Sequence, residues 1–176
     1  REIAQRFNNQ VGKEYFVLPE ILFTETPKIR STADPSRKMS KSAGEKHNIS
    51  VFADEAVIRK RIRSAVTDTG DTASGAMSEG VSNLFELLKA SDHKDAYDKL
   101  MADFEKGTLK YSELKESVAE ALVGLSNAFK EKKEQILADK KQVKYEIKQS
   151  SAQIRQLAQE TVREVKDLCG LINVKF

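Results

Sequence analysis

Apolar residues recur at helical spacing from residue 54 almost to the end of the chain, and this pattern limits the folds open to it. Four segments carry it in the middle of the chain: 57–66, 84–88, 96–104 and 118–129. Repeats of three and four residues place apolar side chains on one helix face, which another element must cover. We therefore expect a mainly α fold, with an all-α bundle over residues 51–176.

Side chains that can accept hydrogen bonds from free N–H groups predict where these helices begin. The candidate caps, in chain order, are Asp54, Ser82 or Asn83, Ser91 or Asp92, and Ser112. The polar, glycine-bearing segment 67–80 is expected to be a mobile loop between the first two helices. The aromatic residues Tyr97, Phe104 and Tyr111 fit packing inside the bundle, and we assign them to its core.

The last third of the chain is highly charged and leaves alternatives open. Residues 130–149 are predicted to form either a helical connection or an exposed hairpin. A final helix carries an apolar stripe, which we expect to face partner helices of the same chain, with a coiled-coil dimer as the alternative. The stripe consists of Val143, Ile147, Ile154, Leu157, Ala158, Val165, Leu168 and Ile172.

The first fifty residues differ from the rest. Residues 1–11 predict a helix that ends near Gly12, the apolar run 15–23 suits a short strand, and residues 28–32 can hold another. Two short strands cannot bury a sheet core alone, so residues 1–50 are expected to be the end of a larger α/β domain. The chain opens without Met and already inside a helical pattern, which indicates a cut chain.

The bulk composition excludes several classes of site. The net charge is only +3, and Cys169 is the single cysteine, so neither a disulfide nor a thiolate metal site is available. His47 and His93 lie far apart in sequence, and we expect no metal held by side chains. No run of about 18 apolar residues suggests a membrane span, and the composition fits a cytoplasmic protein.

Basic residues are concentrated near the middle of the first half. Arg59, Lys60, Arg61 and Arg63 fall within five positions, a density that can attract a phosphate backbone. A solvated helix face is the alternative interpretation of the same cluster.

A segment of lysines and serines lies between the predicted strand at 28–32 and the first helix of the bundle. Its centre reads Lys38–Met39–Ser40–Lys41–Ser42, and Gly44 follows. In open α/β sheets ligands bind beyond the carboxyl ends of strands, so such a loop is well placed. Two lysines, two hydroxyls and free N–H groups can hold phosphates and stabilise the charge of departing pyrophosphate.

These five letters match the signature loop of class I aminoacyl-tRNA synthetases, and other segments resemble the tryptophanyl-tRNA synthetases among them. The resemblance covers "REIAQRFN" (1–8), "DPSRKMSKS" (34–42), "IRKRIRSAVTDT" (58–69), "GVSNLFELL" (80–88) and "YSELKESVAEAL" (111–122). It implies a Rossmann-type catalytic domain ending near residue 50. It also implies a helical domain over 51–176 that receives the tRNA anticodon, whose last helix packs back on the catalytic domain.

The resemblance also implies roles for particular residues. Lys38 and Lys41 would bind the ATP phosphates with Mg²⁺ and act in catalysis, Lys41 with the larger share. The backbone of Met39 and the side chain of Ile29 would lie near the adenine. Ser40 and Ser42 would shape the loop and donate hydrogen bonds.

The implied activity is ligation of tryptophan to tRNA(Trp) through tryptophanyl-adenylate, by a protein that is a homodimer at full length. The family's first, histidine-rich signature is not among these residues, so this chain alone is expected to be inactive. Ala43 and Arg30 stand where the family usually carries Asp and Met. Two alternatives stay open: a tyrosyl-type synthetase, and a helical RNA-binding or interaction module without catalysis.

Overall fold

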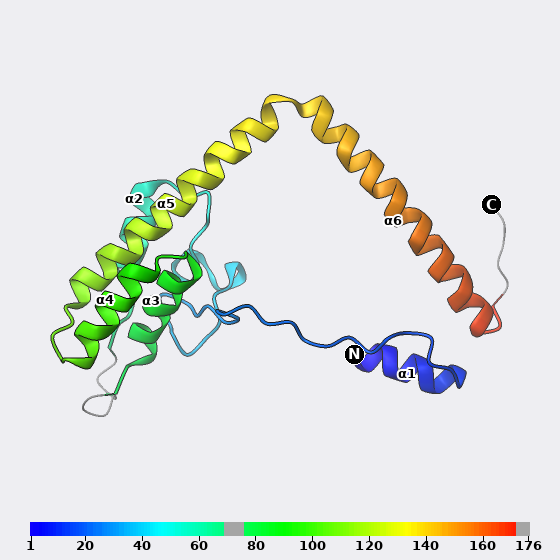
Figure 1. Ribbon diagram of the computed structural model, residues 1–176, viewed down its shortest axis with the longest axis horizontal. Coiled ribbons are helices and arrows are strands. Elements are labelled where there is room, and N and C mark those ends of the chain that lie inside the picture. Colours follow the sequence, from blue (N-terminus) through cyan, green and yellow to red (C-terminus); the bar gives the residue numbers. More distant parts are fainter. Residues whose placement is uncertain (69–75, 172–176) are drawn as a thin grey trace. The chain divides into compact units, whose positions relative to one another are not determined.

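The computed structural model describes residues 1–68 and 76–171 of the 176-residue chain, and these residues are mainly helical (Figure 1). The α-helices are α1 (Glu2–Val11), α2 (Glu55–Arg63), α3 (Glu79–Ala90), α4 (Lys94–Glu105), α5 (Tyr111–Ala138) and α6 (Lys140–Leu168). Two short 3-10 turns, η1 (Lys41–Ala43) and η2 (Glu45–His47), precede α2. The mainly α fold class is therefore confirmed.

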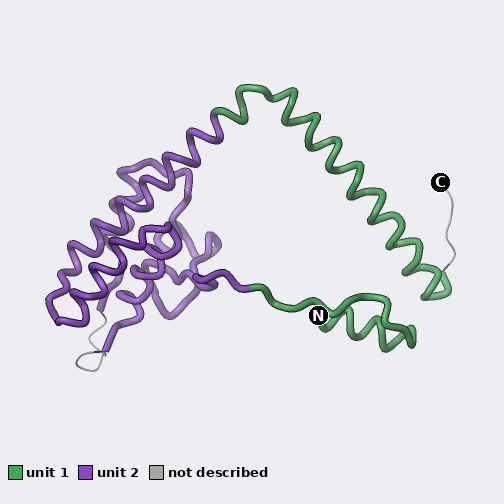
Figure 2. The backbone as a smooth tube through the Cα atoms, viewed as in Figure 1, with its two compact units in different colours: residues 1–22, 135–176 green, residues 23–134 purple. Residues whose placement is uncertain are grey.

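The chain divides into two compact units (Figure 2). Unit 1 contains residues 1–22 and 135–176, and unit 2 contains residues 23–134. The boundary near residue 50, with a catalytic part before it and a helical part after it, remains a prediction.

Unit 2 is built around one hydrophobic core from α2, α3, α4 and α5. Leu84, Leu88 and Leu114 are at most 1% exposed, and Phe85 packs edge-on against Tyr97 with ring centroids 5.5 Å apart. Phe104 also packs on this core, as expected, whereas Tyr111 is 38% exposed, so its assignment to the core was wrong. Tyr111 is the first residue of α5, where a side chain can reach water.

Helix α3 begins four or five residues earlier than the sequence pattern predicted. Ser78, not Ser82 or Asn83, is the cap, and its Oγ accepts a hydrogen bond from the backbone N–H of Val81. The same hydroxyl donates to the carbonyl of Thr67. Ser91, predicted to begin α4, instead donates to the carbonyl of Leu87 at the end of α3.

Neither predicted strand forms within the described residues. Residues 15–23 have no strand partner, and Val17 and Leu22 are more than nine-tenths exposed. Segment 28–32 contributes only an isolated antiparallel bridge between Arg30 and Lys38. The apolar composition favoured strands, but a strand needs a neighbour to accept its backbone hydrogen bonds.

The charged segment after residue 130 is helical, which settles the choice between a connection and a hairpin. Helix α5 continues to Ala138, and Asp139 separates it from α6. The Asp139 carboxylate accepts hydrogen bonds from the N–H groups of Lys141 and Gln142 at 3.1 and 2.9 Å. This cap begins a new helix instead of continuing the old one.

Among the described residues of unit 1 no partner helix covers the apolar stripe of α6, so the expected packing and the alternative coiled-coil dimer remain predictions. No residue of α6 is buried, and Ile147, Ile154 and Leu157 are each more than 60% exposed. The stripe's last member, Ile172, and residues 69–75 of the loop expected at 67–80 lie outside the described residues. Within the described ranges no helix is both long and apolar enough to cross a membrane.

Unit 1 is organised around a buried asparagine. The side chain of Asn8 on α1 donates to the carbonyl of Phe16 at 2.7 Å and accepts from the N–H groups of Tyr15 and Phe16. The Tyr15 hydroxyl donates to the Glu164 carboxylate of α6 at 2.9 Å. Whether the last helix packs on a catalytic domain nevertheless remains a prediction.

The start of α3 approaches the backbone of residues 66–67 so closely that only glycine fits at position 80. A Cβ on Gly80 would lie 2.2 Å from the carbonyl oxygen of Val66. We expect Gly80→Ala to lower the free energy of unfolding by about 1–3 kcal/mol, because backbone atoms must move. Chemical denaturation of the chain measures this loss.

Gly124 is the matched control, since it lies within α5 and a Cβ there meets nothing within 4 Å. Gly124→Ala is expected to raise the free energy of unfolding by about 0.5–1 kcal/mol through helix propensity. Equal effects of the two substitutions would contradict the close approach at Gly80.

Candidate functional site

The signature loop, Lys38–Ser42, continues from the second arm of a short hairpin in unit 2. The N–H of Met39 donates to the carbonyl of Ile29 at 3.0 Å, and the N–H of Ser31 donates to the carbonyl of Arg37 at 2.9 Å. These bonds flank the bridge between Arg30 and Lys38. The hairpin therefore fixes the register of Lys38 and Met39 against Ile29.

The turn of this hairpin is built by Asp34, Pro35 and Ser36. The N–H of Arg37 donates to the Asp34 carbonyl at 3.1 Å, which closes a four-residue turn with Pro at its second position. The Asp34 carboxylate accepts hydrogen bonds from the Ser36 hydroxyl at 2.6 Å and from the Ser36 N–H at 3.2 Å. The bond from the Ser36 hydroxyl is the main cause that holds the pKa of Asp34 below its ordinary value of 3.8.

After the signature residues the chain turns back onto the hairpin. Turns η1 and η2 bring His47 next to Ser31, and its Nδ1 lies 2.9 Å from the fully buried Ser31 hydroxyl. The Thr32 hydroxyl donates to the carbonyl of Lys46 at 3.1 Å. Gly44, between the two turns, has a φ of +105°, a backbone conformation that residues with a side chain rarely adopt. The loop is therefore tied at both of its ends.

A buried asparagine attaches the hairpin to the helical core. Asn83 on α3 is 3% exposed; its Oδ1 accepts from the N–H of Arg30 at 2.8 Å, and its Nδ2 donates to the carbonyl of Arg30 at 3.0 Å. One side chain thus satisfies both backbone groups of Arg30, as a neighbouring strand would. We call this pair of hydrogen bonds the Asn83 clamp.

The Arg30 side chain adds a second attachment. Its Nη1 donates to the carbonyl of Pro35 at 2.8 Å and to the Glu79 carboxylate of α3 at 2.6 Å. The ion pair is about a third to a half exposed, so its contribution to stability is modest. Arg30 therefore joins the turn, the bridge and the start of α3.

The two lysines of the loop remain available for a ligand. Lys38 and Lys41 are exposed, and neither side chain has an ion pair or hydrogen bond with any described residue. The hydroxyls of Ser40 and Ser42 lie 2.8 Å apart and bond to each other. The arrangement presents two cationic groups from a braced backbone, which suits a polyanionic ligand.

The structure brings together most of the residues that the sequence singled out. Ile29 and Met39 are half-buried and joined through their backbones, and Ile29 also packs on the core of unit 2. Sequence reasoning missed Asn83 as a supporting residue because an amide near a helix start resembles a cap. The available signal was one amide inside the apolar stretch "VSNLFELL". The ligand roles of the loop residues remain predictions.

Comparison with known families identifies the protein family to which a chain with this loop belongs. The family described as "tRNA synthetases class I (W and Y)" matches residues 1–127, which include the hairpin, the signature loop and α2 to α4. The chain belongs to this family.

Its relatives narrow the class further. The chain is 34% identical to a protein named tryptophan–tRNA ligase from Clostridium perfringens, over 98% of this chain and 52% of the relative. It is 31% identical to the tryptophan–tRNA ligase of Enterococcus faecalis, over 97% of this chain and 52% of that protein. The chain thus spans about half the length of these curated relatives.

Solved structures agree with this assignment. The tryptophanyl-tRNA synthetase of Mycoplasma pneumoniae superposes with a TM-score of 0.80 at 29% identity, covering 98% of this chain and 52% of that chain. The tryptophanyl-tRNA synthetase of Campylobacter jejuni, complexed with ADP and tryptophan, gives a TM-score of 0.61 at 28% identity, covering 97% and 52%.

The Asn83 clamp can be tested by removing the amide. Asn83→Ala leaves the partly buried N–H and carbonyl of Arg30 without partners, and we expect the free energy of unfolding to fall by about 1–3 kcal/mol. Asn127→Ala, at an exposed position on α5, is the control and is expected to change it by less than about 0.5 kcal/mol. Similar losses in urea denaturation of the two variants would contradict the clamp.

The hydrogen bonds in the hairpin turn predict how its stability depends on pH. Because the folded pKa of Asp34 is lowered, its stabilising effect is present above the ordinary pKa of 3.8 and is lost as the pH falls through the folded value. Ser36→Ala removes the main cause, so the pKa of Asp34 should rise toward 3.8. An NMR titration of the carboxyl carbon measures it, and an unmoved pKa would contradict this role for Ser36.

Proposed function

We propose that this chain supplies the nucleotide-facing loop and a helical tRNA-binding part of a tryptophan–tRNA ligase. The observation that carries the proposal is the complete five-residue signature, Lys38–Ser42, on a hairpin braced by the Asn83 clamp. The names of the relatives support tryptophan as the amino acid. The substrates would be tryptophan, ATP carrying Mg²⁺ on its phosphates, and tRNA(Trp).

Lys38 and Lys41 would bind the β- and γ-phosphates of ATP. The tryptophan carboxylate attacks the α-phosphorus, the bond to the bridging oxygen of pyrophosphate breaks, and tryptophanyl-adenylate forms. Negative charge then accumulates on the departing pyrophosphate, and two unpaired ammonium groups stabilise it as it develops. Lys41, on η1 and outside the hairpin ladder, is proposed to contribute the larger share.

The hairpin would place the base of the nucleotide as well. The half-buried side chain of Ile29 and the backbone of Met39 lie together where the two arms of the hairpin pair, and both are proposed to lie near the adenine. Ser40 and Ser42, hydrogen-bonded to each other, would hold the loop shape and donate to phosphate oxygens on binding. Positioning of this kind lowers the barrier without covalent participation.

Transfer of the aminoacyl group to the terminal ribose of tRNA(Trp) would follow. The helical residues after position 50 are proposed to receive the anticodon, and the full-length enzyme to act as a homodimer in the cytoplasm. Single-stranded loops are read by stacking and by contacts to the backbone, for which a helical scaffold with many lysines and arginines is suitable.

The test is ATP–pyrophosphate exchange by the protein expressed from its complete gene. We expect exchange that depends on tryptophan and that falls by about 10²–10³-fold in Lys41→Ala, the loss typical of one electrostatic group aimed at developing charge. Lys132→Ala, an exposed lysine on α5 outside the loop, is the control and should leave exchange unchanged.

Other outcomes discriminate between the alternatives. Exchange that depends on tyrosine would assign a tyrosyl-type enzyme. No exchange with either amino acid, from a folded protein, would overturn the catalytic proposal and favour a helical RNA-binding module.

A further inference from the structure

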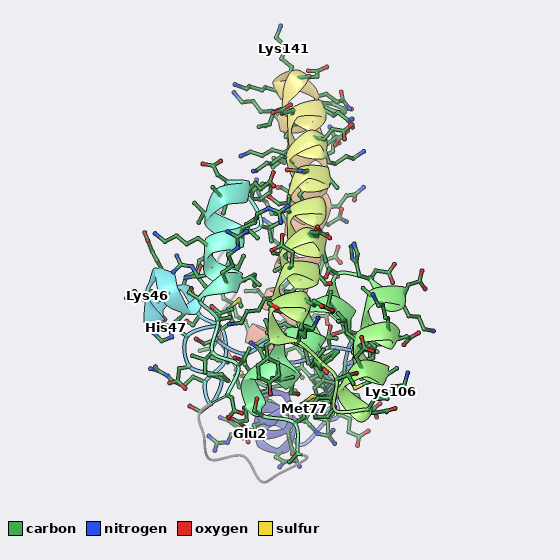
Figure 3. All side chains as sticks on the ribbon, turned by 90° about the vertical axis from the view of Figure 1, so that its left-hand side faces the viewer. Glu2, Lys46, His47, Met77, Lys106 and Lys141 are labelled. Atoms are coloured by element: carbon green, nitrogen blue, oxygen red, sulfur yellow. The ribbon has the colours of Figure 1, made fainter. Side chains whose placement is uncertain are left out.

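The four cations of α2 separate into two groups with different surroundings. Arg59 bonds to Glu55 at 2.8 Å and to Glu116 of α5 at 2.7 Å, and Arg63 lies 3.7 Å from the same Glu116 carboxylate. These two arginines therefore join α2 to α5, which lie side by side (Figures 1 and 3). They hold the helix in place through the shared Glu116 carboxylate.

Lys60 and Arg61 belong to a second stripe of α2. Positions 57, 60, 61 and 64 follow each other at helical spacing, so they form one stripe. This stripe lines a cavity of about 620 Å³. The opposite walls are Thr32 and Ala33 of the hairpin, with Glu45 and Lys46 of η2. We call it the α2 cavity.

The α2 cavity is closely connected to the signature loop. Figure 3 labels Lys46 on η2, next to the ribbon of α2. Hydrogen bonds hold the wall of the cavity in place. The Thr32 hydroxyl donates to the Lys46 carbonyl, and the Thr32 carbonyl accepts from the N–H of Val66 at 2.9 Å. Lys46 follows Lys41 by five residues in a segment tied to the hairpin. A ligand in the cavity would therefore lie against η2, the turn that follows the signature loop.

The charge in the cavity is not balanced. Three cations, Lys46, Lys60 and Arg61, face one carboxylate, Glu45. None of the three cationic side chains forms an ion pair or hydrogen bond with any residue in the described part of the chain. Ammonium and guanidinium groups gathered from two elements in this way fit the oxygens of a phosphate.

We propose that the α2 cavity binds a backbone phosphate of the tRNA, a contact that rests on the proposed function. A phosphodiester carries one negative charge, which the net positive charge of three cations and one carboxylate attracts. The apolar wall atoms of Ala33 and Val57 suit the adjoining ribose. Contacts of this kind position a nucleic acid without reading its sequence.

This assignment resolves the basic cluster that the sequence left open between a phosphate-binding patch and a solvated face. Arg59 and Arg63 act within the fold, and Lys60 and Arg61 face the cavity. Helical geometry and the position of Glu116 divide the four cations into these two pairs. The sequence alone does not show this division, because all four fall within five positions.

The test measures the Kd for tRNA(Trp) over a range of salt concentrations, using the protein expressed from its complete gene. The double variant Lys60→Ala/Arg61→Ala is expected to weaken binding roughly tenfold and to reduce the salt slope by about one to two. The control is Arg6→Ala/Lys13→Ala, which removes two exposed cations that neither line the cavity nor belong to the helical part after position 50, and it should change neither quantity by as much. Lys46→Ala tests the cavity from its other wall.

The possible outcomes distinguish failure of the tRNA contact from failure of the proposed ligase function. Absence of amino-acid-dependent ATP–pyrophosphate exchange in the unaltered protein would overturn the enzyme, whatever the tRNA affinity. A Kd and salt slope that change no more in the cavity variants than in the control would overturn the tRNA contact. A raised KM for pyrophosphate with unchanged tRNA binding would assign the cavity to free polyphosphate and also overturn it.

Discussion

The Asn83 clamp is the interaction on which the rest of the site depends. Two short segments pair through only a few backbone hydrogen bonds, and so small a hairpin is marginal on its own. A buried amide on α3 replaces the missing neighbouring strand and binds both polar groups of Arg30. Leaving these partly buried groups without partners costs free energy, and this cost is the clamp's contribution to the stability of the hairpin.

Two functional surfaces share this one support. One end of the hairpin sets the register of Ile29, Lys38 and Met39, from which the signature loop begins. The other end carries Thr32 and Ala33, which line the α2 cavity. The proposed contacts to ATP phosphates and to a tRNA phosphate would therefore be positioned by the same few hydrogen bonds.

The sequence predicted what depends on local pattern and missed what depends on distant partners. Helices α4 and α5 followed from apolar spacing, and the signature loop followed from five adjacent residues. Asn83 was assigned to a helix cap because its true partner, Arg30, lies 53 residues away. The strand expected at 15–23 failed for a related reason, since it required a pairing partner that apolar composition cannot specify.

Native-state hydrogen exchange tests the central claim most directly. If the Asn83 clamp makes the hairpin part of the helical core, the amides of Ser31 and Met39 should open with nearly the same free energy as the buried amide of Leu88 on α3. Exchange of the two hairpin amides through a local opening, several kcal/mol less costly than that of Leu88, would contradict the account.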